Sequence, residues 1–419
     1  MTQLYTKVEE KRFAWFPVLL LITVFQIISF IQVILKTEDI DLKTLGVFSG
    51  YIVIECLYFL IAWLVTKKTN FELEMIAFFL SGIGLAISAS VEQDFAFKQF
   101  VAIILGLVGF IVLNLILKDV DLVMKLRMPV AIGAVALLIV NILIASEFNG
   151  TLNWISIGGI SIQPSELVKV AFVFVGAATL EKLQSARSIT KYIIFAVACV
   201  GILFLMRDFG TALIFFFTFI IIAFMRSGDI RTIILICAAA LLGALLIIYF
   251  KPYVATRFAT YRHVWDYIDD QGFQQTRTLI YSAAGGLFGV GIGNGELKDI
   301  FASTTDLVFG MLCEEWGILL AFVVISCFAF ITIYTIKSAK TSISAFYTIA
   351  SCSAAALLMF QCALNVFGCT DILPFTGVTL PFISRGGTSM ICCWAMLSFI
   401  KSADTFSAVP SVIKKEVAE

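Results

Sequence analysis

Long runs of apolar residues recur along the whole chain and are separated by short polar segments. Each run has about 20 residues, the length that a helix needs to cross a hydrocarbon core about 30 Å thick. The pattern predicts twelve membrane-spanning helices, near residues 13–35, 47–66, 73–91, 98–117, 129–147, 163–181, 190–206, 208–226, 231–250, 306–336, 343–367 and 376–403. The fold class expected from this pattern is an all-α polytopic membrane protein.

The composition excludes an ordinary soluble protein. Of 419 residues, 60% are hydrophobic, 40 are Phe and only 14% are charged. One soluble core could not bury so much apolar surface. The ten cysteines lie almost entirely in predicted spans and form no C-x-x-C pair at a membrane face, so we expect them to be small packing residues rather than metal ligands or disulfides.

Charge in the short loops predicts the orientation of the chain. The first apolar run follows a charged N-terminus and lacks a small-residue cleavage site, so it is expected to be a retained helix. With the N-terminus inside, 18 of the 29 basic residues fall on one side, from Lys7, Lys11 and Arg12 to Lys414 and Lys415. Cytoplasmic loops carry such an excess. Both termini are therefore expected to be cytoplasmic, with 406–419 as a cytoplasmic tail.

The longest loop, 251–305, is expected on the outer side, before the tenth helix. It is charged, and long loops without a targeting role are usually functional. It holds the only histidine, His263, for which we expect contact with solvent or lipid headgroups. It also holds the run G-G-L-F-G-V-G-I-G-N-G, Gly285 to Gly295. No strand precedes this run, so a tight turn is favoured over a nucleotide site.

Ionisable residues within spans are functional candidates, because burying each one costs about 2.5–3.5 kcal/mol. In Q-P-S-E-L-V-K, Gln163 to Lys169, the pair Glu166 and Lys169 shares one helix face. The pair could be functional or could simply neutralise itself and fix a helix in the bundle. In R-D-F-G-T-A-L, Arg207 to Leu213, Asp208 is placed to cap a helix.

Three further acids lie in S-T-T-D-L-V-F-G-M-L-C-E-E-W-G, Ser303 to Gly317. On a helix, Asp306 and Glu314 are about 12 Å apart, and Glu315 points roughly the other way round the axis. They cannot form one paired-carboxylate site. Asp306 is expected at the membrane mouth, whereas Glu314 and Glu315 lie deeper and need internal partners, for which Lys169 is a candidate.

Five segments together resemble the SEDS family (shape, elongation, division and sporulation), the RodA, FtsW and SpoVE group. They are Asn153–Lys169, Arg207–Leu213, Gly272–Gly295, Thr305–Gly317 and Leu373–Ser389, in the order of the family. The resemblance covers residues 72–405 and implies a ten-helix core. Residues 1–71 would then be an N-terminal extension with two extra transmembrane helices, and an even number of added helices leaves the predicted sidedness unchanged.

The resemblance implies a peptidoglycan glycosyltransferase of the bacterial cytoplasmic membrane. Such enzymes polymerise lipid II, a disaccharide-pentapeptide linked through diphosphate to undecaprenol, at the outer face, for elongation, division or sporulation. It also implies a class B penicillin-binding protein as the transpeptidase partner. The proposed catalytic Asp of the family falls on Asp306.

The position of Asp306 suits this chemistry. Because a lipid diphosphate is already a good leaving group, an inverting transfer needs one general base and cations for the departing diphosphate, without the paired carboxylates of a glycosidase. Candidate cations are Lys169, Arg257, Arg277 and Lys298. A divalent cation, Mg²⁺ or Mn²⁺, could assist them, and no organic cofactor is expected. Gln163, Gln274 and Ser384 are the remaining substrate-binding candidates.

The chain departs from the family pattern near Asp306. Relatives usually read Leu-Pro-Glu-x-His-Thr-Asp, whereas this chain reads I-F-A-S-T-T-D, with Phe301, Ala302 and Thr304 in place of Pro, Glu and His. Asn153 replaces a basic residue. Arg385 stands where a Tyr is usual and adds a cation.

Two other functions stay open. Ionisable residues in spans and helices broken by Gly or Pro also suit a lipid II flippase or another lipid transporter. Against transport, the charges concentrate on one face, whereas a transporter needs a path through both. A catalytically weak scaffold of a cell-wall synthesis complex would explain the altered motif before Asp306.

Overall fold

The structure is a computed structural model that describes residues 15–36, 42–67, 70–148, 151–157, 160–180, 186–228, 230–231, 234, 236–238, 260–342 and 344–405. Helices in these residues coincide with eleven of the predicted spans, and the span predicted at 231–250 lies largely outside them. The helices are α2 (Phe16–Lys36), α3 (Leu42–Thr66), α4 (Glu72–Val91), α5 (Gln93–Ile116), α6 (Val120–Ile144), α7 (Pro164–Leu180), α8 (Ala186–Leu205), α9 (Phe209–Ser227), α13 (Val308–Ala339), α14 (Ala345–Cys369) and α15 (Gly387–Thr405).

Eight helices in the described residues are long and apolar enough to cross a membrane. The prediction of an all-α multi-pass membrane protein is confirmed. Two helix starts differ most from the predicted ones. Helix α6 begins nine residues before position 129, because its first turns carry charges that the apolar pattern misses and Asp119 caps them by accepting from the amides of Asp121 and Leu122. Helix α15 begins at Gly387 rather than at 376.

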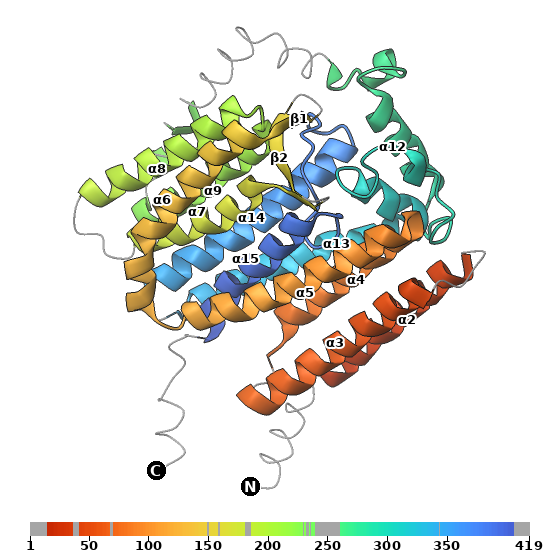
Figure 1. The fold of residues 1–419 in the computed structure, drawn as a ribbon, viewed down its shortest axis with the longest axis horizontal. Helices are drawn as coiled ribbons and strands as arrows, with labels where there is room; N and C mark the ends of the chain where they lie inside the picture. The colour runs from red at the N-terminus through yellow and green to blue at the C-terminus, as the bar shows by residue number, and fades with distance from the viewer. Residues whose placement is uncertain are drawn as a thin grey trace. The chain divides into compact units, whose positions relative to one another are not determined.

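The chain, coloured by residue number in Figure 1, divides into two compact units. The first unit contains Met1–Ile104, Gln274–Cys327 and Thr379–Met390, and the second contains Leu105–Phe273, Phe328–Val378 and Ile391–Glu419. Helices α5, α13 and α15 each contribute to both. Every site described below lies within one unit.

In the first unit, α2 and α3 pack against α4 through aromatic rings. The rings of Phe30 and Phe48 stack with centroids 4.1 Å apart. Polar contacts accompany them, since Gln26 and Tyr51 both donate hydrogen bonds to the Phe78 carbonyl oxygen of α4. Buried amide and hydroxyl groups are stable only with such partners, so these bonds fix how the first two helices lie on α4.

In the second unit, α6, α7, α8, α9 and α14 lie side by side (Figure 1). A small antiparallel sheet, β1 (Ser146–Phe148), β2 (Thr151–Ile157) and β3 (Ile160–Ile162), joins α6 to α7. Its strands β2 and β3 pair Ile157 with Ile160 across the glycines at 158 and 159 in the sequence. Gly-Gly between short β-branched runs is typical of a hairpin, and the apolar-run analysis did not predict this sheet.

The long segment before α13 carries its own structure, as expected. Its described part holds η1 (Val264–Tyr267), α12 (Phe273–Ala284) and η2 (Leu297–Asp299). Helix α13 is interrupted at Gly317, where φ is 84° and ψ is 170°. The backbone groups freed by this kink pair with the glycine-rich run, as Val290 N–Glu314 O (2.9 Å), Gly291 N–Glu315 O (3.1 Å), Ile318 N–Gly286 O (3.0 Å) and Leu319 N–Leu287 O (3.4 Å).

The glycines allow this close approach of two backbones. Gly289 has a φ of +80°, and a Cβ there would clash with the carbonyl group of Glu315. The positive φ and the lack of space for a Cβ both favour glycine at this position. The prediction of a tight turn at Gly285–Gly295 is confirmed, and its function is to pack against the kink in α13.

Candidate active site

The segment that carries Asp306 is a compact set of turns before α13. Ala302 has a φ of +64°. Its carbonyl oxygen accepts hydrogen bonds from three amides, those of Thr305 (3.1 Å), Asp306 (3.0 Å) and Leu307 (3.1 Å). Asp306 thereby lies two residues before the first residue of α13 and is half-buried. A carboxylate in this position is held by its backbone and is partly exposed.

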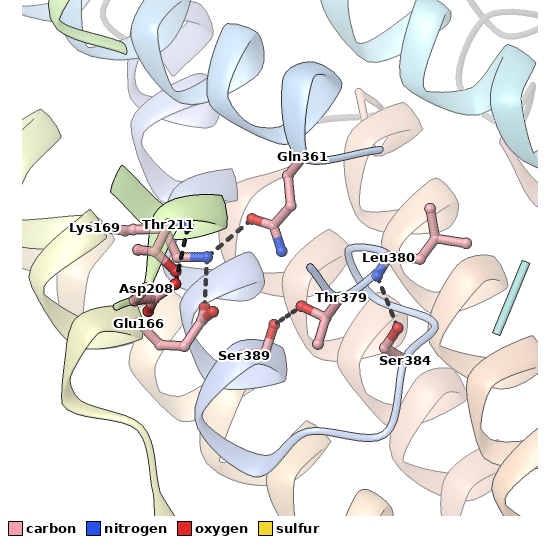
Figure 2. A network of polar contacts seen from close by, with 9 residues as sticks. All are labelled: Glu166, Lys169, Asp208, Thr211, Gln361, Thr379, Leu380, Ser384 and Ser389. Carbon is pink, nitrogen blue, oxygen red and sulfur yellow. Dashed lines mark hydrogen bonds and ion pairs between the residues drawn. The ribbon is translucent and has the colours of Figure 1, made fainter. Parts of the chain in front are cut away.

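An irregular loop of the same unit, residues 379–386, packs against the Asp306 segment. The Ser384 hydroxyl accepts from the Leu380 amide at 2.7 Å, as Figure 2 shows. The same hydroxyl donates to the Thr305 carbonyl oxygen at 2.6 Å. The next residue, Arg385, donates from its backbone amide to the Thr304 carbonyl oxygen at 2.7 Å. Ser384 was predicted to bind substrate. It is 3% exposed, and its hydroxyl joins the loop to the Asp306 segment.

Gln99 of α5 braces the back of this loop. Its Nε2 donates to the Ser384 carbonyl oxygen at 3.2 Å, and its Oε1 accepts from the Gly386 amide at 3.3 Å. Gly84 of α4 lies so close to the loop that a Cβ there would clash with the Ile383 carbonyl oxygen. The loop is therefore fixed from two helices of the first unit.

Glu314 is a structural anchor with internal partners, as expected, but these partners are backbone amides rather than Lys169. Its Oε1 accepts from the Glu296 amide at 2.7 Å, and its Oε2 accepts from the Leu297 amide at 3.0 Å. A carboxylate that accepts two backbone amides is well satisfied. The expected partner, Lys169, binds Glu166 instead. Glu314 therefore anchors η2, and Glu315 is buried beside it, 1% exposed.

Two other predicted site residues of the first unit donate to backbone carbonyl groups. Gln274 of α12 donates from Nε2 to the Phe301 carbonyl oxygen at 3.0 Å. Lys298 of η2 donates from Nζ to the Gly293 carbonyl oxygen at 3.0 Å. Arg277 is half-buried on α12, and Arg257 lies outside the described residues. Gln274 thus contacts the turn that leads to Asp306, and Lys298 contacts the glycine-rich run.

Lys169 belongs to a second polar cluster, which lies within the second unit. Its Nζ is 2.8 Å from Glu166 Oε2 and donates to Gln361 Oε1 at 3.0 Å (Figure 2). Lys169 is 2% exposed and Glu166 4%. The pairing predicted from the i, i+3 spacing is confirmed, and a buried ion pair of this kind needs the additional hydrogen bond that Gln361 supplies.

Asp208 lies close to this pair and influences its electrostatics (Figure 2). It is the N-cap of α9, where its Oδ1 accepts from the Thr211 amide at 3.1 Å, so the predicted cap is confirmed. Gln163 immediately precedes α7, and its carbonyl oxygen accepts from the Glu166 amide at 3.1 Å. It is half-buried at the start of the helix that carries Lys169.

Outside the membrane-spanning segments, Tyr281 has a shifted pKa. Partial burial, with the negative charge of Glu296 adding to it, raises the pKa of Tyr281 on α12 above its ordinary value. In the part of the chain that the structure describes, no group of three His, Cys, Asp or Glu side chains gathers to hold a metal ion.

Two residues that organise these clusters were not singled out from the sequence. Gln361 completes the coordination of Lys169 from α14, and Gln99 braces the 379–386 loop from α5. Both are 1% exposed. A glutamine in an otherwise apolar helix is the signal that could have found them, because an amide in a span needs a partner.

Comparisons with known proteins follow the same segments. Residues 76–408 match the model of the cell cycle protein family named after FtsW, RodA and SpoVE. The probable peptidoglycan glycosyltransferase FtsW of Moranella endobia is 31% identical over 333 residues, which cover 74% of this chain and 87% of that protein. Stage V sporulation protein E of Bacillus subtilis is 28% identical over 249 residues, 58% of this chain and 68% of that protein.

Solved structures share the fold. A chain from a structure titled "Structural coordination of polymerization and crosslinking by a peptidoglycan synthase complex" superposes with a TM-score of 0.67, at 23% identity, covering 80% of this chain and 97% of that chain. The crystal structure of the rod shape determining protein RodA of Thermus thermophilus gives a TM-score of 0.60 at 22% identity, covering 80% and 96%. Similarity at this level of identity concerns the fold.

Proposed function

The chain belongs to the FtsW, RodA and SpoVE family of cell cycle proteins, and we propose that it is a peptidoglycan glycosyltransferase that polymerises lipid II. The names of its relatives support the reaction class. The observation that carries the proposal is the position of Asp306, half-buried and held by backbone contacts directly before α13.

In the proposed reaction, Asp306 is the general base. Its carboxylate accepts the proton of the GlcNAc 4-hydroxyl of one lipid II as that oxygen attacks the anomeric carbon of the other substrate. The bond from that carbon to the diphosphate breaks with inversion, and the electron pair leaves with the polyprenyl diphosphate. A single base is sufficient, because the leaving group needs no protonation by a second carboxyl.

An acid of α13 with backbone partners supports this assignment. Glu314 accepts from two amides and is 3% exposed, whereas Asp306 is half-buried. Cations have a separate role, which is to stabilise the charge that develops on the diphosphate. Within the first unit we assign this role to Arg277 and Lys298, with Gln274 and Ser384 shaping the site. Lys169 and Gln163 of the second unit, and Arg257 beyond the described residues, stay candidates from the sequence.

We further propose that the reaction takes place at the outer face of the bacterial cytoplasmic membrane. The distribution of basic residues supports cytoplasmic termini and an outer position for the 251–305 segment. The partner proposed is a class B penicillin-binding protein, which would cross-link the new strands. A structural relative comes from a peptidoglycan synthase complex that couples polymerization to crosslinking. A divalent ion, Mg²⁺ or Mn²⁺, would act with the diphosphate.

The experiment that tests the reaction uses the purified full chain, alone and with a candidate class B penicillin-binding protein. Lipid II is supplied with Mg²⁺, with Mn²⁺ or with a chelator, and glycan strands are separated on a gel. Polymer in any of these conditions supports the proposal. Lipid II that crosses the bilayer of proteoliposomes without polymer indicates a transporter, and neither polymer nor crossing indicates a scaffold.

A further inference from the structure

Arg385 is held rigidly beside the Asp306 segment by three contacts with two residues. Its backbone amide donates to the Thr304 carbonyl oxygen at 2.7 Å, and its side-chain Nε donates to the Thr304 hydroxyl at 3.1 Å. Its Cζ lies 3.5 Å from the centre of the Phe95 ring. A guanidinium fixed at Nε and stacked on an aromatic face has lost most of its side-chain freedom before any ligand arrives.

The outer part of this guanidinium has no partner among the residues that the structure describes. Of its five N–H groups, only the one on Nε donates to a described residue. Among the described acids none forms an ion pair with it, and the carboxylate that influences it electrostatically is the exposed Glu92. Arg385 itself is half-buried. A partly desolvated cation with four free donors favours an anion that offers several oxygens.

The position of Arg385 links it to the proposed base. Thr304, which accepts from Arg385, precedes Asp306 by two residues. Thr305 lies between them, and its carbonyl oxygen accepts from the Ser384 hydroxyl at 2.6 Å. Two successive contacts therefore join the Arg385 loop to the chain directly before Asp306. All of these residues belong to the first unit.

We propose that the two terminal nitrogens of Arg385 bind the diphosphate of a polyprenyl-diphosphate-linked donor sugar. Planar guanidinium groups bind phosphate oxygens in a bidentate manner. As the bond from the anomeric carbon to the diphosphate breaks, the electron pair and the negative charge pass to the diphosphate, where Arg385 stabilises them. This inference rests on the proposed function, and it adds a residue that the sequence analysis recorded only as a departure from the family pattern.

The test measures binding separately from catalysis. The full chain is placed in phosphatidylcholine nanodiscs, and the affinities for undecaprenyl diphosphate, undecaprenyl phosphate and undecaprenol are measured. Arg385→Gln is expected to weaken diphosphate binding about tenfold or more and to leave undecaprenol binding unchanged. Arg385→Lys should give an intermediate loss of diphosphate affinity, because lysine keeps the charge but lacks the two terminal nitrogens that bind phosphate oxygens together. The matched control is Arg262→Gln, at an exposed arginine of the second unit.

A second variant tests the positioning of the guanidinium. Thr304→Val keeps the shape of the side chain and removes the acceptor of Nε, so diphosphate affinity should fall about threefold or more while the charge of Arg385 is retained. Because Thr304 is buried, 3% exposed, undecaprenol affinity and the elution volume on size exclusion report whether each variant is folded. Nanodiscs with excess phosphatidylglycerol test whether an ordinary lipid phosphate occupies the site.

The inference is wrong if Arg385→Gln binds undecaprenyl diphosphate as tightly as the native chain does. It is also wrong if that variant loses undecaprenol equally, or if phosphatidylglycerol abolishes the difference between variant and native chain. Its failure is separable from that of the proposed function. If the native chain polymerises lipid II and diphosphate binding does not depend on Arg385, the proposed function holds and this inference is wrong. If diphosphate binding depends on Arg385 but no polymer forms, this inference holds and the proposed function is wrong.

Discussion

Lys169 Nζ lies 2.8 Å from Glu166 Oε2 inside α7, and both side chains are almost inaccessible. Breaking one partner of a buried ion pair leaves an uncompensated charge, which costs about 3–5 kcal/mol. Lys169→Met should therefore destabilise the chain by about that amount, and Glu166→Leu with Lys169→Met should recover most of the loss. Unfolding in detergent measures the free energy of unfolding of each variant. The control Lys118→Met, at an exposed lysine, should change stability by less than about 0.5 kcal/mol. A double variant as unstable as Lys169→Met alone would contradict the account.

Glu314 is expected to be an anchor of η2 rather than a catalytic acid. In Glu314→Gln, one of the two amides at residues 296 and 297 would face an NH₂ group, at a cost of about 1–3 kcal/mol. Hydrogen exchange of these two amides should rise. Glu296→Gln, at an exposed acid of the same segment, serves as the control and should leave their exchange unchanged.

Gly84 is expected to set the position of the 379–386 loop. In Gly84→Ala, the new Cβ would meet the Ile383 carbonyl group and displace the loop, at about 1–3 kcal/mol. Polymerisation should fall with it, because Ser384 and Arg385 move away from the Asp306 segment. Gly133→Ala on α6 is matched, since its Cβ would meet nothing within 4 Å. Equal activity of the two variants would argue against a fixed loop.

Two glycines of the Gly285–Gly295 run separate backbone conformation from packing. Both Gly286 and Gly289 have positive φ, at +56° and +80°. A Cβ on Gly286 meets nothing within 4 Å, whereas one on Gly289 clashes with the Glu315 carbonyl group. Gly286→Ala should cost about 1–2 kcal/mol from its backbone alone, and Gly289→Ala should cost clearly more. Thermal unfolding of the two variants side by side decides whether the run packs against the α13 kink.

The sequence was most informative where local spacing determines structure. Apolar runs located eleven helices of the described chain, and the i, i+3 spacing of Glu166 and Lys169 and the cap at Asp208 follow from residues close in sequence. The family resemblance, which rested on five such segments, is confirmed.

Contacts between distant residues could not be predicted in this way. Gln361 reaches Lys169 across 192 positions, and the partners of Glu314 are backbone amides, which no residue type reveals. The loop at 379–386 lies within an apolar run, so hydropathy predicted a helix there. Its hydrogen bonds to Gln99 and Thr305 stabilise an irregular backbone instead.

The central claim is that Asp306 is the general base of lipid II polymerisation. It is tested most directly by the initial rate of glycan synthesis in Asp306→Asn, compared with Asp299→Asn at an exposed acid of the same segment. Loss of a general base predicts a rate lower by at least about a hundredfold for Asp306→Asn, with unchanged undecaprenyl diphosphate affinity, and a native rate for Asp299→Asn. An Asp306→Asn chain that polymerises lipid II at the native rate would contradict the account.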